Sequence, residues 1–308
     1  MADIEQMMRT LKLGGLAKDW REVEYHDTEQ YVTDLLQIEL HEREVNRINR
    51  MVKTAGFHVI KTLDDFVWKP EIELPAGLTR EYMEDLDFIN AKENLIFMGA
   101  VGTGKTHLAT AIALKACQER HKVRFFTAAL LANILLERNN KGKLNGFMTS
   151  LKKVELIVID ELGFVPLHKD AAQLMFQVIS ECYERKSLII TSNLEFSGWN
   201  TVLGDNRLTA ALIDRLVHHS HIVIFSGESY RLQQSMKRQK TARKNLAKSL
   251  NIQKGLQKCI GGAPQGLQKC IARASKKDSK NAEQELAKGL QKYTTGALLL
   301  CTNRAPTR

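Results

Sequence analysis

Eight consecutive residues carry the most specific chemical signal in this sequence. Residues 99–106 read Gly-Ala-Val-Gly-Thr-Gly-Lys-Thr and match the pattern G-x-x-x-x-G-K-[ST] at every fixed position. Glycines let the backbone N–H groups of such a loop curl around phosphate oxygens, and the N-terminus of a following helix adds a favourable dipole. We therefore expect a bound nucleoside triphosphate, with Lys105 on its β- and γ-phosphates and the Thr106 hydroxyl as a ligand of Mg²⁺.

A pair of acidic residues supplies the second part of the same chemistry. Asp160 and Glu161 follow four apolar residues, Leu156–Ile159, which are typical of a buried strand. We expect Asp160 to complete the Mg²⁺ shell, and Glu161 to polarise a water molecule for attack on the γ-phosphate. An apolar run ending in Asp-Glu is mostly structural when it stands alone. Beside a complete phosphate loop it indicates catalysis of hydrolysis.

A sheet must bring these side chains together, and the surrounding pattern predicts one. From residue 94 onward, helical stretches alternate with short apolar runs at Leu95–Met98, Val123–Phe126, Leu156–Ile159, Leu188–Thr191 and Ile222–Phe225. Such alternation is typical of βαβ units around a mostly parallel sheet, so we predict an α/β fold.

The residues before this sheet follow a different pattern. Apolar residues recur at helical spacing from Met7 to about Ala55, with an interruption at Gly14-Gly15 and a glycine stop at Gly56. Residues 57–90, which contain two prolines and polar stretches, read as a connector. We predict a small helical N-terminal domain at residues 1–67 and a nucleotide-binding domain at residues 68–240.

The net charge of +10 is concentrated at the end of the sequence. Residues 241–308 contain 14 Lys and Arg against 3 Asp and Glu, so the rest of the chain is close to neutral. The unit Gly-Leu-Gln-Lys recurs there among few large apolar residues, and we predict a disordered basic tail that is dispensable for nucleotide turnover. Two readings of the tail stay open, a functional basic arm and a read-through extension. The total charge is therefore no sign that the folded body binds DNA.

Composition also limits the class of protein. The apolar runs are far too short to cross a bilayer, the N-terminus lacks the basic start and apolar core of a signal peptide, and five cysteines form no C-x-x-C pair. We expect a cytoplasmic protein with free thiols and no membrane partner.

Further blocks give the chain a family resemblance over roughly residues 5–236. It resembles the IstB-like ATPases, helper proteins of bacterial insertion-sequence transposition that are related to the DnaC helicase loaders. The resemblance rests on LKLGGL at 11–16, KTLDDF at 61–66, GTGKTHL at 102–108, IDELGF at 159–164, TSNL at 191–194, ALIDRLVHHS at 211–220 and GESYRL at 227–232. It implies an AAA+ P-loop fold with ATP as the nucleotide. The 68-residue tail departs from the family pattern.

The resemblance also implies roles for individual residues. Asn193 is similar to the polar sensor that holds the attacking water near the γ-phosphate, and Arg231 resembles a second sensor that touches ATP in its own subunit. Arg215 resembles the arginine finger that enters the ATP site of a neighbouring subunit. The residues expected to contact the nucleotide in the loop are Gly99, Ala100, Val101, Gly102, Thr103, Gly104, Lys105, Thr106 and His107.

A local basic cluster lies between the second and third predicted strands. It comprises Arg138, Lys141, Lys143, Lys152 and Lys153. We expect it to contact DNA phosphates without discriminating between bases, and the alternative is a solvated loop. The clustered histidines His218, His219 and His221 have no cysteine or carboxylate at a ligand spacing, so we expect a structural role for them.

These observations lead to one functional expectation and two alternatives. The expected protein is a bacterial ATPase that assembles as a homo-oligomer on DNA, with ATP at subunit interfaces, and stimulates a partner transposase. The first alternative is a DnaC-like loader of a replicative helicase. The second is a nucleotide-switched scaffold with negligible turnover.

Overall fold

The N-terminal part of the protein is helical, as its periodicity predicts. The computed structural model describes residues 4–230, 236, 239 and 241. Helices α1 (Ile4–Thr10) and α2 (Leu16–Asp19) and the short turn η1 (Trp20–Glu22) precede the long helix α3 (Thr28–Ala55). Asp27 caps the start of α3 by accepting the N–H of Gln30, and Gly56, at a φ of 85°, ends it in the left-handed conformation that glycine adopts readily.

Glu39 joins the N-terminal helices together. Its side chain is only 5% exposed, and one carboxylate oxygen accepts the backbone N–H groups of Gly15 (3.0 Å) and Leu16 (3.1 Å). These donors begin α2 and have no partner within that helix. Burial alone would raise the pKa of Glu39, but the hydrogen bonds from Arg43 and from these two amides hold it below its ordinary value. Glu39 is therefore a buried charge that fixes α2 on α3.

The segment between α3 and the sheet is more than the predicted connector. It contains the two-residue strand β1 (Ile72–Glu73) and the short helices α4 (Arg80–Glu84) and α5 (Asp87–Ala91). Its buried side chains belong to the core of the nucleotide-binding region: Phe66, Leu78, Met83, Leu86, Phe88 and Ile89. Its prolines and polar residues hid this content, because none of its elements is long enough to show a period.

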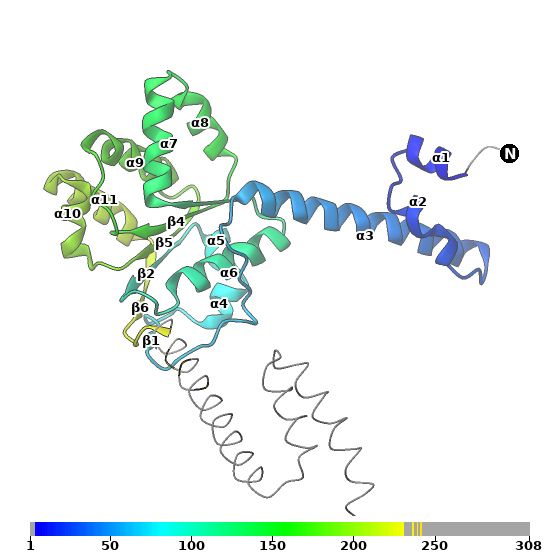
Figure 1. The fold of residues 1–308 in the computed structure, drawn as a ribbon, viewed down its shortest axis with the longest axis horizontal. Coiled ribbons are helices and arrows are strands. Elements are labelled where there is room, and N and C mark those ends of the chain that lie inside the picture. The colour runs from blue at the N-terminus through cyan, green and yellow to red at the C-terminus, as the bar shows by residue number, and fades with distance from the viewer. Residues whose placement is uncertain (1–3, 231–235, 237–238, 240, 242–308) are drawn as a thin grey trace, which may run out of the picture. The chain divides into compact units, whose positions relative to one another are not determined.

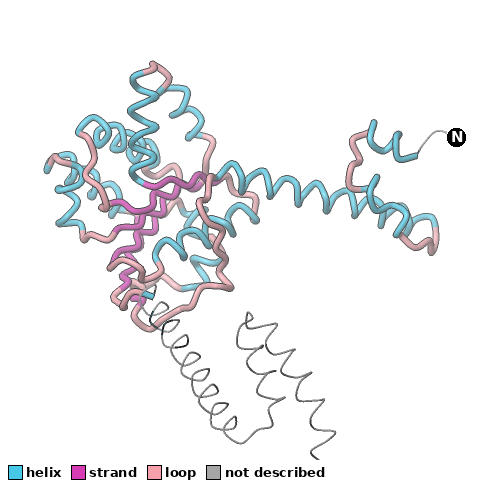
Figure 2. Tube along the Cα trace, in the orientation of Figure 1, coloured by secondary structure: helices cyan, strands magenta, loops and turns pink. Residues whose placement is uncertain are grey.

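The sheet confirms the predicted fold class. All five predicted strands are present, as β2 (Asn94–Gly99), β3 (Val123–Thr127), β4 (Leu156–Leu162), β5 (Ser187–Ser192) and β6 (Ser220–Phe225). The strand order is β1-β6-β2-β5-β4-β3, and every pair is parallel except β1 with β6. Figure 2 shows the strands gathered into one sheet with helices on both sides.

Alternating side chains of the strands divide the core into two layers. Leu95 and Phe97 pack with the end of α3, α4, α5 and α6 (Lys105–Gln118), whereas Ile96 and Met98 face the opposite helices. Those helices are α7 (Ala128–Asn140), α8 (Leu144–Lys152), α9 (Lys169–Cys182), α10 (Trp199–Leu203), which follows the turn η2 (Phe196–Gly198), and α11 (Asn206–His218) (Figure 1). The result is a helix–sheet–helix sandwich that carries polar side chains at the carboxyl ends of β4 and β5, on either side of which β2 and β3 complete the parallel part of the sheet with β6.

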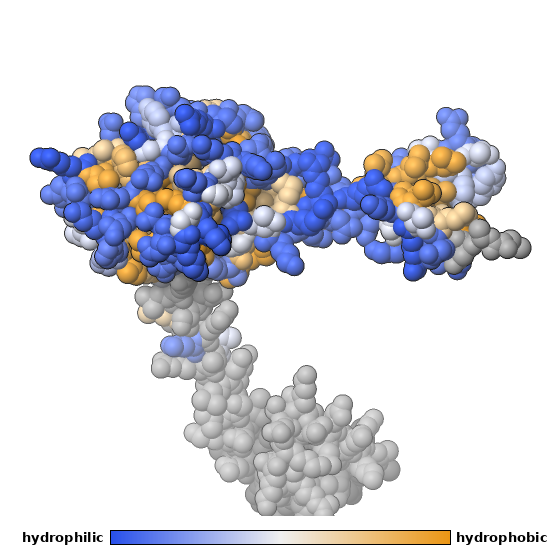
Figure 3. Space-filling model, turned by 90° about the horizontal axis from the view of Figure 1, so that it is seen from above, coloured by the Kyte–Doolittle hydropathy of each residue, from blue (hydrophilic) through white to orange (hydrophobic). Residues whose placement is uncertain are grey.

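The described residues also allow the expectations on the cysteines, on membrane-spanning segments and on the tail to be compared with the structure. Figure 3 shows hydrophilic residues along the middle of α3 and apolar residues gathered on the N-terminal helices, where Met7, Leu11 and Leu36 are exposed. Cys117 and Cys182 are free, buried thiols. No helix among the described residues is both long and apolar enough to cross a bilayer. The predicted tail lies outside the described residues except for Thr241.

Candidate nucleotide-binding site

The phosphate loop connects the end of β2 to the start of α6. Gly99 has a φ of 140° and Gly102 a φ of 81°, so both use backbone conformations that side chains disfavour. A Cβ at Gly99 would also collide with the carbonyl of Phe225 on β6, and one at Gly102 with the side chain of Ser229. The loop therefore needs glycine for its turn and for the close approach of neighbouring backbone.

The side chain of Lys105 is hydrogen-bonded to the backbone of the phosphate loop. Its side chain is buried, and Nζ donates to the carbonyl oxygens of Gly99 (2.7 Å) and Ala100 (2.6 Å). An ammonium has three donors and needs acceptors wherever it is shielded from water. The loop thus keeps the charge at its centre, where phosphate oxygens would add acceptors.

Asp160 is the centre of a hydrogen-bond network at the carboxyl ends of the strands. Only 3% exposed, it accepts at Oδ1 from the Thr106 hydroxyl (2.9 Å) and from the Thr191 hydroxyl (2.5 Å). The first contact joins the two predicted Mg²⁺ ligands. The second comes from β5, which lies between β2 and β4, and involves a residue to which the sequence analysis gave no role.

Thr191 also holds the backbone of Glu161. Its Oγ1 accepts the N–H of Glu161 at 2.9 Å while its own hydrogen goes to Asp160. A β-bulge interrupts the pairing of β4 with β5 between Ile159 and Leu162, and Glu161 lies in it at a φ of 60°. A non-glycine residue in this region costs about 1–3 kcal/mol and is found mostly at functional sites. The bulge leaves the Glu161 side chain exposed, while Asp160 stays buried.

Asn193 lies beside the loop that follows Glu161. Its Oδ1 is buried and has no hydrogen-bond partner among the described residues. Gly163 is close to it, because a Cβ added at Gly163 would come within 2.7 Å of that oxygen. An unsatisfied buried acceptor costs about 1–3 kcal/mol, so this site has an unused place for a donor such as a water molecule.

Two segments distant in sequence cover the phosphate loop. Phe66 packs against Gly104 and against the His107 ring (5.3 Å between centroids), whose Nε2 lies 3.2 Å from the Thr62 carbonyl. From the other end of the chain, the N–H of Tyr230 donates to the Gly102 carbonyl at 2.8 Å. Arg231, the predicted second sensor, follows directly but lies outside the described residues.

Arg215 is not brought to this phosphate loop. Its guanidinium contacts the hydroxyl of Ser180 and lies 4.9 Å from the centroid of the Phe176 ring, both on α9. It also lines a cavity of about 550 Å³ with residues of α8 and α9. Arg215 therefore packs against α9 of its own chain.

The five predicted DNA contacts separate into two groups. Arg138, Lys141 and Lys143 surround the turn from α7 to α8, whereas Lys152 and Lys153 are at the other end of α8. A helix rises 1.5 Å per residue, so about 15 Å separates the two groups. Lys141 pairs with Glu137 (2.6 Å) and Lys152 approaches Glu181 at 3.7 Å. The segment consists of two helices joined by an exposed turn at residues 141–143, so DNA contact stays a prediction and a solvated surface stays its alternative.

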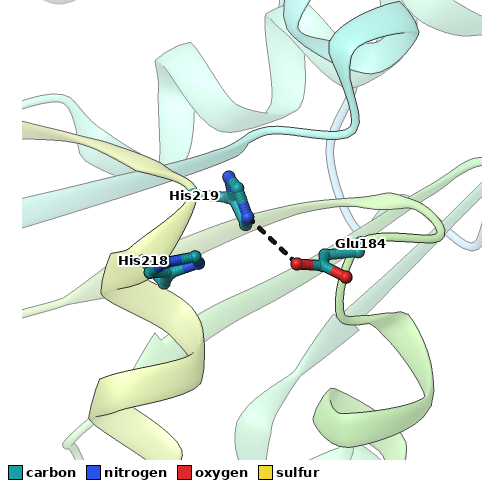
Figure 4. Close-up of side chains that lie close together, drawn as sticks. All are labelled: Glu184, His218 and His219. Carbon is teal, nitrogen blue, oxygen red and sulfur yellow. Dashed lines mark hydrogen bonds and ion pairs between the residues drawn. The ribbon is translucent and has the colours of Figure 1, made fainter.

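The clustered histidines contact neighbouring elements. The fold supplies the carboxylate that the sequence spacing lacks: Glu184, His218 and His219 offer one ligand atom each within 4.8 Å of one another. In Figure 4, a hydrogen bond joins His219 to Glu184, with His218 beside them. His218 also contacts the Tyr183 hydroxyl at 3.0 Å. These contacts join the end of α11 to the turn that follows α9, and a structural role for the histidines stays a prediction.

Comparisons with known proteins agree on one family. Residues 6–238 match the family described as IstB-like ATP binding protein. The ATP-binding protein of insertion sequence IS5376 from Geobacillus stearothermophilus is 35% identical over 237 residues, covering 75% of this chain and 94% of that protein. The corresponding IS21 protein from Pseudomonas aeruginosa is 34% identical over 210 residues, covering 68% and 78% of the two chains.

Solved structures with a similar arrangement are more distant. AMPPCP-bound DnaA from Aquifex aeolicus matches with a TM-score of 0.46 and 23% identity over 59% of this chain and 55% of that chain. The DnaC helicase loader matches with a TM-score of 0.40 and 21% identity over 54% of this chain and 96% of that chain. From the extent of the family match and the identity to the insertion-sequence proteins, this chain belongs to the IstB-like ATP-binding proteins.

Proposed function

We propose that this protein is a Mg²⁺-dependent ATPase that assembles on DNA and stimulates a partner transposase in insertion-sequence transposition. The observation that carries the proposal is the Thr106–Asp160–Thr191 network, which places Glu161 exposed and in a strained conformation beside the phosphate loop. A strained backbone that holds an exposed carboxylate next to the proposed metal ligands favours hydrolysis, because nucleotide binding alone does not require that carboxylate.

The residues present fit a metal-bound triphosphate. Thr106 and Asp160 already share a hydrogen bond, and hydroxyl and carboxylate oxygens are the ligands that Mg²⁺ prefers. When bound, the ion neutralises charge on the β- and γ-phosphates. Lys105 contacts the same phosphates, Glu161 orients and polarises the attacking water, and the unsatisfied oxygen of Asn193 accepts a hydrogen bond from that water.

The arginine finger requires a second subunit. Arg215 contacts Ser180 and Phe176 of its own chain, so its role in catalysis is at the ATP site of a neighbour. An arginine there stabilises the charge of the transferred phosphoryl group, an effect of about 10³–10⁵ in comparable enzymes. ATP between subunits then couples nucleotide binding to assembly.

The relatives support the proposed partner and location. Their names place them in insertion sequences, which supports DNA as the surface of assembly and the transposase of the same element as the partner. Action on DNA in bacteria implies a cytoplasmic location.

The experiment combines ATP turnover with DNA strand transfer by the transposase encoded beside this protein. Wild type should hydrolyse ATP and increase strand transfer, while Lys105→Ala and Arg215→Ala should each fail in both assays. A mixture of the two variants should recover part of both activities, because one kind of mixed interface contains both intact groups. A chain that hydrolyses ATP but activates a replicative helicase instead would replace this function with helicase loading.

A further inference from the structure

A basic groove lies at the end of α6 opposite to the phosphate loop. We use this name for the hollow of about 460 Å³ whose ionisable lining residues are Arg47, Arg50, Arg120, Lys122, Arg124 and Lys153. Every one of them is basic. Since α6 has 14 residues at 1.5 Å each, roughly 20 Å of helix separates the groove from the phosphate loop.

The positive charge of the groove is largely uncompensated. Arg47, Lys122 and Lys153 are exposed, and their side chains have no carboxylate partner in the described part of the chain. Of the two nearby carboxylates, Glu44 pairs with Arg120 (2.9 Å), and Glu155 accepts the backbone N–H of Lys122 and contacts His121. Arg47, Lys122 and Lys153 therefore bring three solvated positive charges together from three different segments.

Arg124 adds a fixed guanidinium to the lining. Its Nη1 donates to the Thr54 carbonyl at 3.2 Å, and its Cζ lies 5.2 Å from the centroid of the Phe126 ring. The buried Nε has no acceptor in the structure described. A guanidinium held in this way keeps donor capacity that the protein itself does not use.

A neighbouring hollow on the other side of Lys153 shows that this charge pattern is not general to the surface. That hollow, of about 340 Å³, is lined by both signs of charge: Lys92, Lys152, Lys153, Arg185 and Lys186 with Glu155 and Glu181. The buried Lys186 ammonium donates to the Leu151 carbonyl, and burial lowers its pKa. The mixed hollow therefore has two carboxylates beside its five basic residues, whereas no carboxylate lines the basic groove.

The chemistry of the groove fits the backbone of DNA. Exposed guanidinium and ammonium groups bind phosphate through charge-assisted hydrogen bonds, and no aromatic side chain is among the groove's lining residues to stack on a base. Arg47 and Arg50 come from α3, whereas Lys122 and Lys153 come from the segments that begin β3 and β4. A strand of DNA between them would meet cations from both sides.

We propose that the basic groove binds the phosphate backbone of DNA, independently of base sequence, and that α3 thereby takes part in DNA binding. The inference rests on the proposed function and names a site for it. In this proposal the groove residues, and not the ion-paired Lys141 and Lys152, make the principal contacts with DNA phosphates. Lys153 belongs both to the groove and to the predicted basic cluster.

The test measures duplex DNA binding by the full chain with fluorescence anisotropy between 50 and 200 mM salt. The groove variant combines Arg47→Gln, Lys122→Gln and Lys153→Gln. A control variant, Lys18→Gln with Arg21→Gln and Arg185→Gln, makes the same change of charge at ion-paired positions. A third variant neutralises the α7–α8 turn at Arg138, Lys141 and Lys143. The basic tail is present in all of them, so its contribution cancels.

The groove variant should lose at least tenfold in affinity, and its plot of log affinity against log salt should become shallower by about 2.7, or about 0.9 for each lost phosphate contact. The control variant should stay within about twofold of wild type, and all variants should keep basal ATP turnover. Equal losses in the groove and control variants would show a diffuse charge effect and overturn the site. A loss confined to the α7–α8 variant would also overturn it. A wild-type chain without DNA affinity would instead overturn the proposed function itself.

Discussion

The nucleotide site and the basic groove are at opposite ends of α6, and they are encoded differently. The phosphate loop is a continuous run of eight residues that contains its own backbone donors, its lysine and the hydroxyl proposed as a metal ligand. The groove takes its cations from α3, the start of β3 and the end of α8, with more than one hundred positions between Arg47 and Lys153. One site can be recognised from its local pattern, whereas the other exists only after folding.

The two sites should also differ in how strongly single substitutions affect them. In the proposed mechanism Lys105 and Glu161 act directly on the reacting groups, so the loss of either should disable the reaction. Each cation of the groove would contribute one screened phosphate contact, so losses there should add in small steps. The following predictions, from the largest effect to the smallest, test whether that contrast holds.

The largest effect should come from Glu161 and Lys105. Glu161→Gln removes the carboxylate proposed to polarise the attacking water but leaves Thr106 and Asp160 in contact, so kcat for ATP should fall by about 10²–10⁴ while ATP affinity is retained. Lys105→Ala should instead weaken nucleotide binding, because a charge-assisted phosphate contact is lost. Binding of a fluorescent ATP analogue and steady-state turnover separate the two variants, with Lys115→Ala at the far end of α6 as a control. Undiminished turnover in Glu161→Gln would contradict the assignment.

An intermediate effect is expected at Thr191, which lies in the TSNL block but for which no role was expected. Thr191→Val keeps the shape of the side chain but leaves Asp160 without a donor and the Glu161 N–H without an acceptor. We expect kcat to fall by about 10–100-fold, the range found for groups that orient metal ligands, with a higher Mg²⁺ concentration needed for half-maximal rate. Thr191→Ser should restore both quantities, because it keeps the hydroxyl. If valine and serine behaved alike at full rate, the network would have no catalytic role.

Thr191 also shows where sequence reasoning reaches its limit. The strands, α3 with its glycine end and the phosphate loop were predictable because each follows from local periodicity or from a short pattern. Thr191 sits in an apolar strand, and only the pairing of β4 with β5 reveals that it faces Asp160. The same holds for Glu184 beside the histidines and for the cations of the groove. Their positions depend on the order of strands in the sheet, which no local pattern contains.

The smallest effect should be at Glu39, a long-range contact in the N-terminal helices. Glu39→Gln keeps an acceptor for the amides of Gly15 and Leu16 but removes the buried charge that also pairs with Arg43. We expect a local loss of about 1–2 kcal/mol, measured as roughly tenfold faster amide hydrogen exchange at Gly15 and Leu16. Glu42→Gln is the matched control, because its exposed pair with Lys18 should leave these amides unchanged.

The pH dependence of the same measurement provides a second check. Because the folded-state pKa of Glu39 is below its ordinary value, the stabilisation by its charge is fully present at neutral pH. It should decline as the pH falls below about 4.3 toward the lower folded-state pKa, and wild type should then approach the Glu39→Gln variant in exchange rate. A difference between the two proteins that persisted unchanged through this range would show that the Glu39 charge does not hold α2 on α3. The N-terminal helices would then depend on their apolar packing and on other polar contacts such as the Lys18–Glu42 pair.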